Sequence, residues 1–295
     1  MILNEAHNSP RDRAFALAVA KALRPLGYSI LAAEGFASDA DPAKLEAMMK
    51  MLAADKYPRL KTGFYLRDPV FGDFVRQSLA LGYRPVAYEQ VGANRALSPL
   101  EQISAREQAQ AENLVQRIFT RDRQAKVLIY VGYSHVAEAP LEGGRECMAA
   151  RLKKRTGVDP LTIDQAAYSD FSISRLDQAY YALVANKLTR PSVLFVGRQP
   201  LLGGQYAKAV DLQILHPRTT FEYGRPTWLR SMGRHPAPVP KALRPKTGKR
   251  LVQVYLTGEA PDAVPVDQVL LEPGKPLPSL MVPRGPVRFS YQDAS

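Results

Sequence analysis

The sequence lacks the groups on which several common classes of protein depend. Its single cysteine, Cys147, excludes an internal disulfide and argues against a thiolate zinc site. No run of about eighteen apolar residues occurs, which argues against a membrane-spanning helix. A Gly-x-Ser-x-Gly elbow, a phosphate loop ending in Gly-Lys-Ser/Thr and a Gly-x-Gly-x-x-Gly loop after a strand are also absent. The sequence therefore disfavours serine-hydrolase and P-loop chemistry.

The composition is that of an ordinary globular protein. Hydrophobic residues make up 46% of the chain and charged residues 23%, so a sizeable core can form without disulfides or metals. No basic and then apolar leader precedes the first predicted strand. We expect a cytoplasmic location for the chain as given, and a periplasmic or lipid-anchored one if a leader belongs in front of it.

Positive charge is in excess and unevenly distributed. The formal net charge is +12, and the segment between Glu222 and Glu259 holds eight Lys or Arg and no acidic residue. A solvated basic surface is the favoured interpretation of this segment, and nucleic-acid binding is the alternative. A small-molecule ligand or substrate remains the expected partner.

Strand-like apolar segments alternate with amphipathic segments over the first three quarters of the chain. The expected strands are residues 1–4, 28–33, 83–88, 126–131, 160–163, 192–196 and 211–215. The expected helices are residues 10–26, 42–54, 69–81, 98–120, 145–155 and 173–188. This alternation predicts an α/β fold with a largely parallel central sheet flanked by helices.

The last quarter of the chain is rich in proline, which favours loops and edge strands. Short strands are still expected at residues 251–256 and 287–291. We therefore divide the chain into an α/β catalytic or ligand-binding domain, residues 1–216, and a proline-rich basic extension, residues 217–295, packed on it.

Polar residues follow four of the predicted strands. These segments are Asn4-Glu5-Ala6-His7, Glu34-Gly35-Phe36, Tyr88-Glu89 and Gly132-Tyr133-Ser134-His135. The carboxyl ends of parallel strands form the functional crevice of open α/β sheets, so these side chains are expected to converge. The alternative for each histidine taken alone is a structural role in the core.

Glutamate and histidine at one crevice suit the activation of water. Glu5 and His7 are two residues apart and point to the same side if the strand persists, while His135 arrives from another strand end. A carboxylate or imidazole with a pKa near the working pH removes a proton from water, and an imidazole or arginine stabilises the resulting oxyanion. The same residues also suit a divalent metal, so the cofactor is expected to be none, a metal or haem.

Glu34 is the expected general base, because burial after a strand should raise its pKa. The alternative is an anchor that pairs with Arg106 inside the core. Arg106 belongs to a polar helical stripe that faces either the site or solvent, whose other members are Gln110, Asn113 and Arg117. Asp68 is equally a candidate helix N-cap and a candidate site residue and is left out of the site, and His216 is interpreted as a turn residue beside the pocket.

The order and spacing of these motifs resemble the erythromycin esterase superfamily, which also includes ChaN-type haem-binding lipoproteins and TraB/TIKI proteins, and the resemblance implies a bacterial protein. The resemblance covers residues 1–165, and its pocket residues correspond to Glu5, His7, Glu34, Arg106 and His135. It implies a hydrolase with Glu5, His7, Glu34 and His135 as catalytic residues and Arg106 and Tyr88 as substrate-binding residues. It equally implies the alternative of a non-catalytic protein that binds haem or another small ligand.

Overall fold

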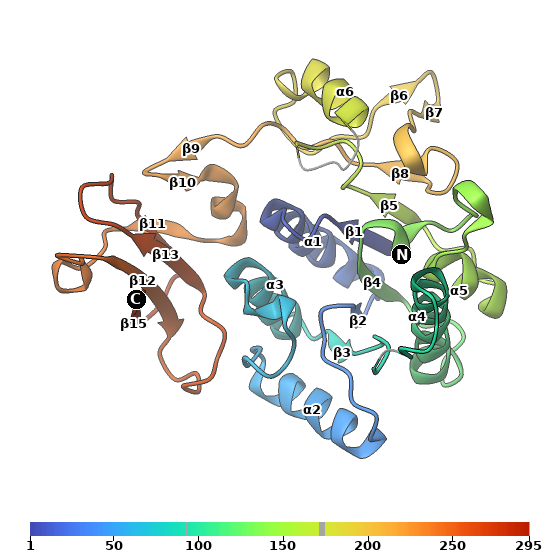
Figure 1. Cartoon of the computed structure of the whole chain (residues 1–295), viewed down its shortest axis with the longest axis horizontal. Coiled ribbons are helices and arrows are strands. Elements are labelled where there is room, and N and C mark those ends of the chain that lie inside the picture. The colour runs from blue at the N-terminus through green and yellow to red at the C-terminus, as the bar shows by residue number, and fades with distance from the viewer. Residues whose placement is uncertain (93, 171–174, 295) are drawn as a thin grey trace.

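The computed structural model of the chain describes residues 1–92, 94–170 and 175–294, and a six-stranded parallel sheet lies at its centre (Figure 1). The strand order is β3 (Arg84–Val86), β2 (Ile30–Ala33), β4 (Val127–Gly132), β1 (Ile2–Glu5), β5 (Thr162–Asp164) and β8 (Leu212–Gln213). All five neighbouring pairs are parallel. The predicted α/β class and parallel sheet are confirmed.

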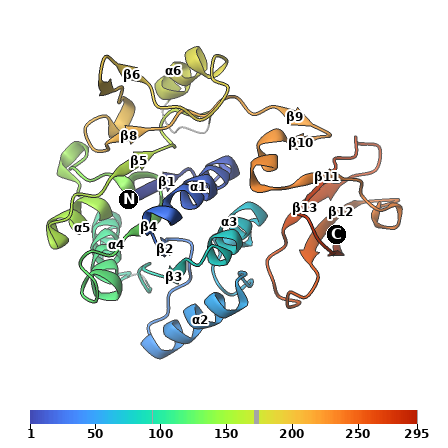
Figure 2. The same ribbon diagram turned by 180° about the vertical axis from the view of Figure 1, so that it is seen from behind.

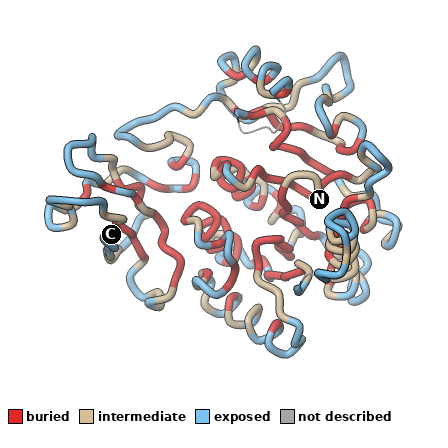
Figure 3. Tube along the Cα trace, viewed as in Figure 1, coloured by how far each residue is buried: buried red, intermediate tan, exposed pale blue. Residues whose placement is uncertain are grey.

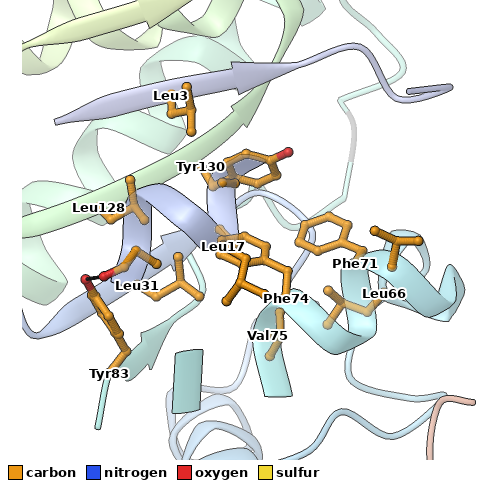
Figure 4. Close-up of a cluster of buried hydrophobic side chains, with 14 of the residues drawn as sticks. Leu3, Leu17, Leu31, Leu66, Phe71, Phe74, Val75, Tyr83, Leu128 and Tyr130 are labelled. Carbon is orange, nitrogen blue, oxygen red and sulfur yellow. Dashed lines mark hydrogen bonds between the residues drawn. The ribbon is translucent and has the colours of Figure 1, made fainter. Parts of the chain in front are cut away.

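Helices cover both faces of this sheet. The helices on one side are α1 (Pro10–Leu23), α2 (Pro42–Asp55) and α3 (Pro69–Ala80), and those on the other are α4 (Pro99–Leu114) and α5 (Met148–Thr156). Alternate strand residues supply the two cores, since successive side chains of a strand point to opposite faces. Leu3, Leu31 and Leu128 pack toward α1 and α3 (Figure 4), whereas their neighbours Ile2, Ile30 and Ile129 pack toward α4 and α5.

The helices begin at the residues that the sequence marks. Asp41 caps α2 and Asp68 caps α3, each by accepting hydrogen bonds from backbone N–H groups of the first turn. Ser98 and Glu101 form the predicted capping box of α4. Helix α4 continues into a π-helical turn, Val115–Phe119, so the predicted long helix is confirmed with a change of pitch near its end.

The order of the strands brings the predicted site together. Strand β4 lies between β1 and β2, with Glu5 paired to Gly132 and Ala33 paired to Tyr130. The carboxyl ends of these three strands are therefore adjacent at one edge of the sheet. Figure 3 shows that the strands themselves are buried, so polar side chains following them emerge beside the core.

The C-terminal region forms small antiparallel sheets beside α3 (Figure 2). One sheet holds β13 (Asp267–Leu271), β12 (Lys249–Leu256) and β15 (Val287–Ala294), and another pairs β11 (His235–Ala237) with β14 (Leu280–Val282). Both expected strands of the tail are present and longer than expected. The region has its own apolar cluster, including Val252, Val254 and Leu280.

Two buried ion pairs attach this region to α3. Arg76 donates to Glu259 at 2.6 and 2.9 Å, and Arg234 donates to Asp73 at 3.0 and 3.1 Å. The expected proline-rich appendage with short strands is confirmed. Its division from the rest as a separate domain at residue 217 stays a prediction.

The sequence analysis was wrong about the strand at residues 192–196. Only β6 (Phe195–Val196) forms there, and it pairs with β7 (Gln199–Pro200) as a hairpin outside the central sheet. Its side chains are exposed, so no core required them to join the sheet. Helix α6 (Arg175–Ala185) lies within the predicted helix, whose first two residues fall outside the described ones. Among the described residues, no helix is both long and apolar enough to cross a membrane.

Candidate functional site

Glu5 and His7 form a hydrogen-bonded pair at the end of β1. The Glu5 Oε1 and His7 Nδ1 atoms are 2.9 Å apart. Arg13, in the first turns of α1, donates to both Glu5 oxygens at 2.7 and 2.8 Å, and the Tyr130 hydroxyl donates to Glu5 Oε2 at 2.8 Å. Burial raises the pKa of Glu5, but the hydrogen bonds and charge of Arg13 and the hydrogen bond of His7 outweigh burial. The pKa of Glu5 therefore lies below its usual value. Glu5 is therefore a fixed carboxylate that orients the imidazole.

Two aromatic side chains contact the ring of His7, and one of them, Tyr133, directly follows β4. It stacks on Tyr65, with ring centroids 4.5 Å apart, and meets the edge of Tyr133 at 5.0 Å. Tyr133 has a φ of 42°, and its carbonyl accepts a hydrogen bond from Asn4 Nδ2 at 2.9 Å. A strained backbone at the end of β4 thus contributes to the placement of His7.

Gly132 provides the space that His7 and Glu34 occupy. A Cβ atom added to Gly132 would lie 2.6 Å from His7 Nε2 and 3.2 Å from Glu34 Oε2. Both side chains therefore converge on one point above this glycine. With Nδ1 on Glu5, the Cε1 and Nε2 atoms of His7 are the ring atoms that lie beside Gly132, close to Glu34 Oε2.

Glu34 is an ion-paired carboxylate after β2. Its Oε1 accepts a short hydrogen bond from Arg106 Nη2, and its Oε2 accepts one from the Gly132 N–H at 2.5 Å. Arg106 also donates to both oxygens of Glu89, at 3.0 and 2.5 Å. Arg106 from α4 thus joins the ends of β2 and β3.

The raised pKa that the sequence analysis expected for Glu34 is wrong. Burial does raise it, but the charges of His135 and Arg106 and the hydrogen bond from Gly132 outweigh burial. The pKa of Glu34 consequently lies below its usual value. The structure thus has the pairing with Arg106 that was the alternative interpretation.

His135 occupies the far side of Glu34. Its Nδ1 is 2.8 Å from Glu107 Oε2, and its Nε2 is 3.1 Å from Arg106 Nη1 and 3.7 Å from Glu34 Oε1. Burial lowers the pKa of His135, but Glu107 and Glu34 raise it above the usual value. His135 therefore takes part in a charged network, whereas His7 lines a cavity.

That cavity has a volume of about 10 Å³, which is close to the space that one water molecule needs. Its walls include the side chains of Glu5, His7, Glu34 and Tyr65. Within the described ranges, no group of three or more His, Cys, Asp or Glu side chains is arranged to hold a metal ion. The geometry thus has room for water between His7 and Glu34.

Other predicted residues have roles near the site. Tyr88 is fully buried, and its hydroxyl donates to the Tyr130 carbonyl at 3.0 Å, so it contacts the core rather than the cavity. His216 is buried against Gln165 at 2.9 Å and does not line the cavity. The polar stripe of α4 and the π-helical turn after it faces inward, since Gln110 donates to Glu89, Asn113 to the Tyr88 carbonyl and Arg117 to the Ala87 carbonyl.

Three residues of the site were missed by the sequence analysis. Arg13 was hidden in the charged first turns of a predicted helix, although a basic residue soon after a strand-end carboxylate was a usable signal. Glu107 lies beside the predicted Arg106 and holds both His135 and the Met148 N–H, the latter at 2.6 Å. Tyr65 begins a short 3-10 helix, Tyr65–Arg67, ahead of α3, and no sequence pattern marks its stacking on His7.

Comparisons with known proteins assign no family. No family description and no curated protein matches the sequence. Among solved structures, the haem-bound ChaN of Campylobacter jejuni is similar at 9% identity, with 74% of this chain and 87% of that chain covered and a TM-score of 0.40. The type III effector HopBA1 is similar at 15% identity, with 50% and 71% covered and a TM-score of 0.33. The function is consequently argued from the site itself.

Proposed function

We propose that the protein is a hydrolase in which His7 activates a water molecule. The observation that carries the proposal is the water-sized cavity between His7 and Glu34, beside an imidazole whose Nδ1 meets the Glu5 carboxylate. An imidazole that donates its Nδ1–H to a fixed carboxylate keeps a basic Nε2 and is stabilised when it becomes protonated. This arrangement suits a general base.

The reaction is the hydrolysis of a carboxylic ester. Water attacks the carbonyl carbon while His7 Nε2 takes its proton, and the tetrahedral oxyanion forms. When the intermediate collapses, the alcohol leaves with the proton that His7 returns, and the acid product remains. Arg106 is 37% exposed and the most accessible cation of the network, so it is the group assigned to the oxyanion.

Glu34 has a positioning role in this proposal. Its carboxylate accepts hydrogen bonds from Arg106 and Gly132, which fixes one wall of the cavity. Its lowered pKa makes it a weak base. Glu34 thus supports the proton transfer without accepting the proton.

Hydrolysis of p-nitrophenyl acetate tests the proposal. The variant His7→Gln should lose about a hundredfold to ten-thousandfold in kcat/KM, the usual contribution of a general base. Arg123→Ala, on an exposed loop outside the site, is the control and should keep the wild-type rate. Equal rates for wild type and His7→Gln would refute the assignment.

A haem titration tests the alternative of a binding protein. The hydrolase proposal expects no Soret shift that saturates at one equivalent of haem. A saturating shift that His7→Gln abolishes, together with no ester hydrolysis by the wild type, would replace the hydrolase with a ligand-binding function.

A further inference from the structure

A second hollow lies in the C-terminal region, where the acid-free basic segment folds. Its volume is about 730 Å³, and it is lined by Arg230, Gly233, Arg234, His235 and Arg284. None of these residues lines the cavity beside His7. The volume falls within the range of about 300 to 1,000 Å³ that is usual for small-molecule sites.

Two segments far apart in the sequence form this hollow. Gly233, with a φ of 80°, turns the chain from a 3-10 helix, Thr227–Met232, into β11. Strand β11 pairs with β14, with His235 opposite Val282 at the end of the ladder, so Gly233 just before β11 and Arg284 just after β14 belong to the same end of this pair. A Cβ atom added to Gly233 would meet nothing within 4 Å, so the backbone there borders open space.

Arg234 is a fixed part of the wall. Its side chain is fully buried and donates to Asp73 at 3.0 and 3.1 Å and to the Pro69 carbonyl at 3.1 Å. Its Nη1 atom has no hydrogen-bond partner in the described part of the chain and lies 3.9 Å from Asp267. Arg234 is thus already paired with the Asp73 carboxylate, but its Nη1 atom can still donate a hydrogen bond.

The other two arginines are available to a ligand. Arg230 pairs with Glu222 at 2.5 Å, but their side chains are 49% and 54% exposed, and such surface pairs are weak. Arg284 is exposed and has no ion pair among the described residues. Among the residues that the structure describes, no carboxylate lines the hollow itself, so Arg284 and a released Arg230 offer two positive charges to one ligand.

We propose that this hollow binds the phosphate group of a small molecule. A phosphate monoester carries close to two negative charges near neutral pH, which matches the charges of Arg284 and Arg230. The planar guanidinium group donates two parallel hydrogen bonds to phosphate oxygens, and His235 is placed to donate a further one. The volume exceeds that of the phosphate alone and accommodates the organic part of a phosphate ester.

Calorimetric titration with inorganic phosphate, glucose 6-phosphate and adenosine monophosphate tests the proposal. We expect saturable binding of one equivalent, with the esters bound more tightly than inorganic phosphate. Arg284→Ala should weaken binding at least about tenfold through loss of a charge-assisted hydrogen bond. Arg123→Ala removes the same charge from an exposed loop elsewhere and should change the Kd less than twofold.

Each contrary result identifies an error in the proposal. Equal weakening by Arg123→Ala and Arg284→Ala would show that net charge alone attracts the anion, and the site would be rejected. The absence of saturation with all three probes, or binding of only a DNA duplex, would also reject it. Equal affinity for phosphate and both esters would show that the organic part makes no contact and would reject the proposed phosphate-ester ligand.

Discussion

Replacement of Gly132 by alanine should displace the His7 ring and lower the activity much more than it lowers the stability of the fold. The backbone of Gly132 has φ −92° and ψ 144°, an ordinary extended conformation that alanine adopts without strain. The added Cβ would instead lie 2.6 Å from His7 Nε2 and 3.2 Å from Glu34 Oε2. Because real Cβ contacts are longer, the His7 ring has to move by about 1 Å.

The two consequences of this movement differ in size. The His7 side chain is 26% exposed and can turn toward solvent, so overpacking should lower stability by only about 1 kcal/mol. A displacement of about 1 Å in a catalytic group costs on the order of a hundredfold in rate. Gly132→Ala should therefore hydrolyse p-nitrophenyl acetate about a hundredfold more slowly and melt only a few degrees lower.

Gly72→Ala is the matched control, because its added Cβ would also be crowded, at 2.7 Å from Val264 Cγ1. Neither Gly72 nor Val264 lines the cavity. It should lower the melting temperature and leave kcat/KM of the folded enzyme near wild type. Wild-type activity in Gly132→Ala, or equal activity losses in both variants, would refute the role given to His7.

Three further predictions concern buried groups. Glu5→Gln removes the charged partner of the buried Arg13, which keeps only Asp68 and the His7 carbonyl, and should lower the free energy of unfolding in urea by about 3 kcal/mol. The same substitution at the exposed Glu46 is the control and should change the free energy of unfolding little. Burial lowers the pKa of His216 to about 3, so wild type should lose stability below about pH 6.5 by up to about 1.4 kcal/mol per pH unit relative to His216→Gln; parallel curves would contradict this. Burial raises the pKa of Cys147 to about 11, so a thiol reagent should label it at about pH 8 only after unfolding, and rapid labelling of folded protein would contradict the burial.

The sheet and the strand ends of the site were predictable because both depend on local patterns. Apolar runs followed by polar residues mark the ends of β1, β2 and β4, and helices between them require parallel strands. The sequence also placed Glu5, Glu34 and His135 at those ends. The fact that β4 lies between β1 and β2 is a long-range property of the packing that local patterns do not encode.

The electrostatics of the site could not be predicted in the same way. Burial of Glu34 follows from its position after an apolar strand, but the sign of its pKa shift depends on Arg106 and His135, far along the chain. Arg13 and Glu5 are close in sequence, yet their contact depends on how α1 crosses the end of β1. The hollow at Arg284 likewise depends on the pairing of β11 with β14.

The two arginines of the site determine which side chain can act as a base. Arg13 holds Glu5 and Arg106 holds Glu34, so both carboxylates are stabilised in their charged form and are poor proton acceptors. His135 is occupied on both ring nitrogens by Glu107 and Arg106. His7 alone among these groups lines the water-sized cavity with Nδ1 on a carboxylate and with no hydrogen bond to Nε2 among the described residues, and for that reason we propose it as the proton acceptor.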